Sequence, residues 1–220
     1  MANYHALQAG YRYTSHHGVT LAVAYTWSHT MTNNQGPQNP RDFQAEYGQW
    51  SNGPRQIFNA GYIWKMPFLK GRNDFKGKAL GTWTFSGITS AISGPPTSLS
   101  MSTAAPVLTT RPNCIGPTSG PKTQSEWFNV NAFTNPAFGF FGNCANGNIY
   151  PPGLQVWDWA LFKTFPIKER LKLQFRFEAF NLWNHPNFTG LSTGYGSGSF
   201  GQLTSALDPR QLEGALRLDF

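Results

Sequence analysis

Two cysteines, Cys114 and Cys144, carry the chemistry that can be read most directly from this sequence. Both lie in a region rich in glycine, proline and asparagine, a composition typical of loops. Their wide spacing rules out the CxxC pair of a zinc site. We therefore expect a disulfide that staples this loop in an oxidising compartment, with two free thiols as the alternative.

The other polar motifs match no catalytic or metal site. The segment 71–78, "GRNDFKGK", is similar to a phosphate-binding loop, but it has one residue too many between its glycines and lacks the following Ser or Thr. The adjacent His16 and His17 fall in a turn, where such a pair is usually solvated. No Ser/His/Asp arrangement and no paired carboxylates stand out in the sequence. We expect no enzymatic activity, no metal and no cofactor.

The composition favours β-structure with polar loops. Charged residues make up 12% of the 220 residues, about half the usual share, while aromatic residues reach 15% with 8 Trp and 18 Phe. Mean hydropathy is only −0.39, because Asn, Gln, Ser and Thr are plentiful. The net charge of +7 comes from scattered Lys and Arg that form no basic stripe, so we expect no nucleic-acid partner.

From the sequence we expect neither a transmembrane helix nor a leader within these 220 residues. No stretch approaches the ~18 uninterrupted apolar residues that a spanning helix needs. The opening "MANYHALQAGYRY" has neither the basic start nor the apolar centre of a signal peptide. If the protein lies beyond a membrane, its export signal is expected on a part outside this chain.

Alternation with a period of two dominates the chain, and helical periodicity is nearly absent. In "GVTLAVAYTWSHT" the odd-numbered residues from Val19 to Trp27 share one face, and in "LKLQFRFEAFNLW" those from Leu171 to Ala179 oppose a charged and polar set. Further candidate strands cover 3–15, 55–66, 79–92, 155–165 and 211–220. This makes an all-β antiparallel meander of about seven or eight strands, each of the length that tilted membrane-spanning strands require.

The connections between these strands alternate between short and long. Large loops are expected at about 31–53, 102–154 and 184–210, whereas short or medium connections fall at 15–18, 67–78 and 166–170. Alternate connections of a meander lie at opposite ends, so all the large loops should gather at one end. Outer-membrane barrels have this asymmetry, with short periplasmic turns and long extracellular loops.

The same parity predicts where the two termini lie. The last strand should descend and leave Phe220 in the periplasm, while Met1 should start on the extracellular side. A self-standing barrel has an even number of strands and both termini on the periplasmic side. We therefore expect this chain to be the C-terminal part of a larger barrel.

The last strand and the aromatic residues predict how the sheet meets lipid. One face of the last strand would form an apolar stripe toward lipid, made of Leu212, Gly214, Leu216, Leu218 and Phe220. Aromatic residues near strand ends would form a girdle at the level of the lipid headgroups. The candidates are Tyr25, Trp27, Tyr62, Trp64, Trp157, Trp159 and Trp183.

Several longer stretches carry a family likeness. They include "YTWSHTM", "GTWTFSGITSAISGPP", "WFNVNAFTNPAFGFFGN", and above all the blocks 153–190 and 199–220. From about residue 3 to its end, the chain resembles the C-terminal barrel segment of TonB-dependent outer-membrane receptors. It is most similar to the Oar-like group, whose larger members carry an N-terminal carboxypeptidase-regulatory-like domain.

The resemblance implies that residues 1–220 belong to a 22-stranded barrel with a plug in its lumen, in the outer membrane of a Gram-negative-type bacterium. It implies uptake of a scarce or bulky ligand, driven by TonB through an N-terminal box. The implied partners are outer-membrane lipid, the plug and earlier strands of the receptor, and the barrel-assembly machinery, for which Phe220 would be the signal. Because signal peptide, TonB box and plug are missing here, the chain alone is not expected to perform energised transport.

Two other readings of the pattern stay open at this point. The first is a self-contained small outer-membrane barrel with a structural or adhesive role. The second is a soluble secreted β-sandwich that binds carbohydrate through exposed Trp and Tyr. The asymmetry of the loops and the alternating last strand favour the membrane readings over the soluble one.

Overall fold

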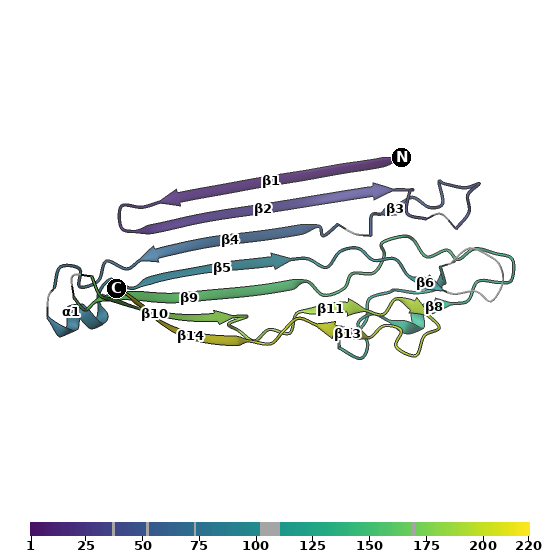
Figure 1. The fold of residues 1–220 in the computed structure, drawn as a ribbon. Coiled ribbons are helices and arrows are strands. Elements are labelled where there is room, and N and C mark those ends of the chain that lie inside the picture. Colours follow the sequence, from purple (N-terminus) through teal and green to yellow (C-terminus); the bar gives the residue numbers. More distant parts are fainter. Residues whose placement is uncertain (37, 52, 73, 102–110, 169) are drawn as a thin grey trace.

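The computed structural model describes residues 1–36, 38–51, 53–72, 74–101, 111–168 and 170–220. Seven long strands form one antiparallel sheet in which each strand pairs with its neighbours along the chain (Figure 1). In order they are β1 (Ala2–Thr14), β2 (Val19–Thr32), β4 (Gln56–Lys65), β5 (Thr84–Ile92), β9 (Leu154–Pro166), β10 (Lys172–Phe180) and β14 (Gln211–Asp219). The predicted antiparallel meander is confirmed.

The connections gather by size at the two ends of the sheet, as Figure 1 shows. We call the ends the loop end, where residues 33–55, 93–153 and 181–210 connect the strands, and the turn end, where 15–18, 66–83 and 167–171 do so. Met1 lies at the loop end and Phe220 at the turn end (Figure 1). Within the predicted loops 31–53 and 102–154, residues 37, 52 and 102–110 lie outside the described part of the chain.

The connections also contain short strands and a short helix. The loop end contains a 3-10 helix, Val130–Ala132, and six short strands. A seventh, β3 (Gly48–Gln49), extends the main sheet by pairing with β2. The six are β6 (Ser100–Met101), β7 (Asn113–Cys114), β8 (Phe133–Thr134), β11 (Phe188–Leu191), β12 (Gly194–Tyr195) and β13 (Leu203–Ala206). They pair as β11 with β13, β12 with β6 and β7 with β8.

The strand predicted over 79–92 begins five residues late, because the chain forms a helix first. Helix α1 (Phe75–Leu80) starts where the Asp74 carboxylate accepts a hydrogen bond of 2.9 Å from the Gly77 amide. This bond and the nearby Arg72 guanidinium hold the pKa of the Asp74 carboxyl below its usual value. β5 therefore starts at Thr84, and residues 79–83 belong to the connection between β4 and β5.

The turn between β1 and β2 is as tight as expected. The Gly18 amide donates to the Ser15 carbonyl at 3.1 Å, and Gly18 has a φ of +81°, which side chains other than glycine rarely adopt. The Gly18 carbonyl also accepts the Lys65 amide at 2.8 Å, so the turn is joined to the end of β4. A Cβ at this position would lie 2.7 Å from the Lys65 carbonyl oxygen, and the site therefore requires glycine.

The strand register sorts the side chains into an apolar face and a polar face. Residues directly opposite each other on paired strands point to the same side. For example, Leu21 lies opposite Tyr62, and Phe85 lies opposite Leu161. Following such pairs across the sheet gives the apolar face, which includes Leu7, Val23, Phe58, Trp64, Trp157, Phe175 and Leu216. The polar face includes Thr26, Asn59, Ser86, Ser90, Asp158, Gln174, Glu178 and Arg217.

The two edges of the sheet are open within the described residues. β1 pairs with β2 alone, and β14 pairs with β10 alone. The outer strands do not meet each other, so the sheet does not close on itself. Each edge therefore presents backbone amides and carbonyls that no described residue satisfies.

Candidate functional site

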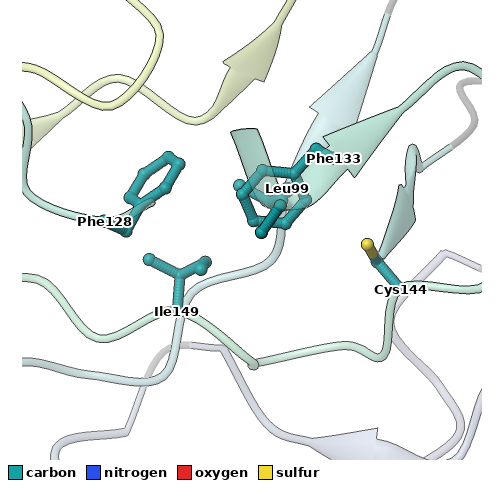
Figure 2. Packing of buried hydrophobic residues seen from close by; sticks show 6 residues of the cluster. Leu99, Phe128, Phe133, Cys144 and Ile149 are labelled. Atoms are coloured by element: carbon teal, nitrogen blue, oxygen red, sulfur yellow. The ribbon is translucent and has the colours of Figure 1, made fainter. Parts of the chain in front are cut away.

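The long connections build a folded head at the loop end, with a hydrophobic core of its own. Figure 2 shows this core, in which Phe128 and Phe133 meet edge to face with ring centroids 5.7 Å apart. Phe200, from the last loop, packs on both rings at 5.0 and 5.6 Å. The fully buried members of this core are Leu99, Phe128, Ala132, Phe133, Cys144 and Ile149. Two loops far apart in sequence therefore fold as one unit.

Cys114 and Cys144 are joined by a disulfide in this head. The two chain segments around it are also held by side-chain hydrogen bonds. The Cys114 amide donates to the Asn143 side-chain oxygen at 2.7 Å, and the Asn143 amide donates to the Asn113 side-chain oxygen at 3.0 Å. These bonds position the two cysteines side by side.

We expect reduction of this disulfide to destabilise the head by about 3–4 kcal/mol, because the bond restricts the unfolded loop. The bond itself is checked by mass spectrometry of a non-reduced digest, which should contain a linked Cys114–Cys144 peptide. A digest of reduced protein is the control, and there the two peptides should separate. Two thiols that alkylate in the native, unreduced protein would contradict the pairing.

A buried ion pair connects the first loop to the second. The Arg111 guanidinium lies 2.8 Å from the Glu46 carboxylate, and their side chains are 9% and 3% exposed. Gln38 adds three hydrogen bonds: its amide donates to Glu46, its side chain donates to the Gly142 carbonyl, and its side-chain oxygen accepts the Arg111 amide. The Asn146 side chain donates to the Glu46 carbonyl at 3.2 Å. We call these five residues the loop clamp.

The last strand presents the stripe that its sequence predicted on the apolar face of the sheet. In register with β10, Leu212 lies opposite Ala179, and Leu216 lies opposite Phe175. The stripe is exposed, since no described residue covers it, and Phe220 at its end is 97% exposed.

The aromatic residues of the predicted girdle lie at different levels of the apolar face. Tyr25, Trp27 and Trp157 lie toward the loop end, and Trp64 lies at the turn end. Tyr62 and Trp159 lie mid-sheet and not at strand ends.

The mid-sheet position of these two rings has a local cause. Tyr62 and Trp159 both pair with Gly87, whose missing side chain leaves room for the Tyr62 ring. The Trp159 indole donates to the Tyr62 hydroxyl at 2.6 Å, and Trp183 packs edge to face on Trp159 at 5.8 Å. The three aromatic residues therefore form one connected cluster.

Lys163 is a residue of the apolar face that the sequence reading missed. Its side chain is buried, and its ammonium donates to the Gly81 carbonyl just after α1. The ammonium also lies 5.6 Å from the Trp83 ring centroid and 5.0 Å from that of Phe165. Backbone oxygen and aromatic faces thus compensate a charge on an otherwise apolar surface. Alternation along β9 predicts that Lys163, like the other odd-numbered residues, lies on the apolar face, but it does not predict these partners.

The polar face contains a shallow hollow at its centre. Its volume is about 520 Å³, and its floor consists of small residues such as Ala22, Gly61 and Ala160. Two carboxylates, Asp158 and Glu178, lie at its border. Asp158 accepts a hydrogen bond of 2.9 Å from the Asn181 amide.

The described residues contain neither a metal cluster nor a spanning helix. No group of three or more His, Cys, Asp or Glu side chains is placed to hold a metal ion there. No helix in that part of the chain is both long and apolar enough to cross a membrane.

Comparison with known protein families decides what the two-faced sheet is. Residues 1–213 match the family described as an outer membrane beta barrel domain. The chain belongs to this family. Comparisons with curated proteins and with solved structures returned no match.

Membership of the outer membrane beta barrel family gives each face its environment. The protein is located in the outer membrane, and its long strands are transmembrane strands. Side chains facing lipid must be apolar, whereas those facing the lumen can be polar. We therefore expect the apolar face to be the lipid face, and the polar face with its hollow to line the lumen.

Proposed function

We propose that this sheet is one section of the wall of a larger barrel that acts as a TonB-dependent receptor and takes up a scarce or bulky ligand. The observation that carries the proposal is the pair of open edges at β1 and β14. Lipid cannot satisfy backbone hydrogen bonds, so each edge needs a further strand. The seven long strands among the described residues fall short of the eight that the smallest barrels use, which favours a larger wall.

The long loops would form the outer mouth of the receptor. Outer-membrane barrels keep short turns on the periplasmic side and long loops outside. The clustered loops of this chain have a core, a disulfide and the loop clamp, and so make a rigid rim. A rigid rim suits ligand capture, because little ordering is needed when the ligand binds.

The lumenal face has features that a plug domain would cover. Ile63 and Ile88 are 44% and 60% exposed on this face, among polar side chains. The hollow bordered by Asp158 and Glu178 gives a plug a place to fit. TonB would act through the N-terminal part of the receptor, and the barrel-assembly machinery would recognise the last strand with Phe220. We propose no catalytic step for this chain.

A pull-down with the periplasmic domain of TonB tests the proposal. The natural gene product would be extracted from outer membranes in mild detergent, and its polypeptide mass measured by denaturing mass spectrometry. We expect a polypeptide much larger than 24.5 kDa that is retained by immobilised TonB domain. A matched receptor lacking its TonB box is the control and should not be retained. A product of 24.5 kDa that the immobilised TonB domain does not retain would instead identify a small barrel with a structural or adhesive role.

A further inference from the structure

A pocket of about 650 Å³ lies on the lipid face at the loop end. Its inner wall is formed by strand residues whose side chains point to lipid, among them Tyr25 from β2 and Phe58 from β4. The head covers it from two sides, with Lys122 and Trp127 from the second loop and His185 from the third. The pocket therefore opens at the rim of the barrel wall, on the side away from the lumen.

The walls of this pocket are aromatic and held in place. The Trp127 indole donates to the Tyr150 carbonyl at 2.7 Å, and the Trp127 amide donates to the Gly201 carbonyl at 2.8 Å. Tyr25 and Phe58 lie directly opposite each other in the β2–β4 register. Aromatic side chains of this kind are enriched where a membrane protein meets lipid headgroups.

A single lysine gives the pocket its charge. The Lys122 ammonium lies 4.7 Å from the Trp127 ring centroid, and it is in none of the ion pairs among the described residues. Lys122 is exposed along part of its length, yet partial burial lowers the pKa of its ammonium. Its backbone has a φ of +61°, a conformation that a lysine rarely adopts and that the surrounding loop must enforce.

We propose that this pocket binds the phosphate-bearing head group of a lipid from the outer leaflet. The unpaired Lys122 ammonium contacts the phosphate, and the apolar wall with Tyr25 and Phe58 receives the upper part of the acyl chains. The location selects a lipid over a soluble anion, because the strand residues of the pocket belong to the lipid face. The inference requires the outer-membrane location, the apolar face toward lipid and the loop end on the outer side, and it stands whether or not the protein is a TonB-dependent receptor.

Native mass spectrometry of the full-length protein in mild detergent tests this binding. The probe is diphosphoryl lipid A, titrated in parallel with chemically dephosphorylated lipid A and with inorganic phosphate. We expect Lys122→Ala to weaken binding of the diphosphoryl form about tenfold or more, because a charge-assisted contact is lost. Lys122→Arg should keep most of the affinity. Lys168→Ala is the matched control, since Lys168 is an exposed lysine at the turn end.

Three results would overturn the proposal. The first is equal binding of the phosphorylated and dephosphorylated lipids, which would point to sugar or acyl recognition. The second is equal loss of affinity in Lys122→Ala and Lys168→Ala, which would mean a nonspecific charge effect. The third is displacement of the lipid by inorganic phosphate at similar concentration, which would mean a soluble anion site. Heat-modifiable migration on SDS gels verifies that each variant is folded before it is titrated.

Discussion

Replacing Leu216 with arginine is expected to prevent assembly of the protein in the outer membrane. Leu216 lies near the middle of β14, on the lipid face, opposite Phe175. An arginine on this face costs about 2–4 kcal/mol at the bilayer midplane. The measurement is the amount of full-length protein in the outer-membrane fraction that shows heat-modifiable migration, which should fall to a small fraction of the wild-type amount.

The matched control places the same arginine on the opposite face of the same strand. Glu213 points to the lumen and lies directly opposite Glu178, so Glu213→Arg replaces a pair of like charges with a pair of opposite charges. We expect near-normal assembly of this variant. Equal loss of assembly in Leu216→Arg and Glu213→Arg would show that the assignment of the two faces is wrong.

Replacing Glu46 with alanine is expected to destabilise the head by about 3–5 kcal/mol, because it leaves a buried charge without its partner. Arg111 would then keep its guanidinium in a site where it is 9% exposed, with one side-chain nitrogen already lacking a partner among the described residues. The loss should appear as faster hydrogen exchange and faster surface proteolysis of residues 38–49 and 111–114. The amount of barrel in the membrane should change little, since the loop clamp lies outside the sheet.

A double variant separates the ion pair from simple packing. Glu46→Leu combined with Arg111→Met removes both charges while keeping apolar volume, and such replacements are often neutral or stabilising. We expect the double variant to regain most of the protection that Glu46→Ala loses. If the double variant exchanges as fast as the single one, the stability of the head does not depend on pairing these charges.

The strands and their faces could be predicted because each depends on local alternation. In β2 the residues from Val19 to Trp27 alternate strictly, and a shift of one residue would expose the whole apolar set to the wrong side. The gathering of the large loops at one end follows from the same meander. The start of β5 was predicted wrongly, because residues 79–83 alternate like a strand while the Asp74 cap starts a helix just before them.

The head and the rim pocket could not be predicted, because their contacts join distant segments without a repeating pattern. Phe128 lies in the second loop and Phe200 in the third, so the strands β9 and β10 separate them in the sequence. Glu46 and Arg111 come from different loops, and neither position stands out in the sequence. Lys163 shows the same limit within a strand. Alternation predicts its face, but its partner Gly81 lies in the connection between β4 and β5.

Cysteine labelling in intact cells tests the central claim most directly, namely that this sheet spans the outer membrane with its loops outside and its turns in the periplasm. Single cysteines would be added to the full-length protein at Ala137, in the second loop, and at Lys168, in the turn between β9 and β10. A membrane-impermeant maleimide should label Ala137→Cys in intact cells, and Lys168→Cys only after the outer membrane is permeabilised. Labelling of Lys168→Cys in intact cells, with Ala137→Cys protected until permeabilisation, would contradict the account.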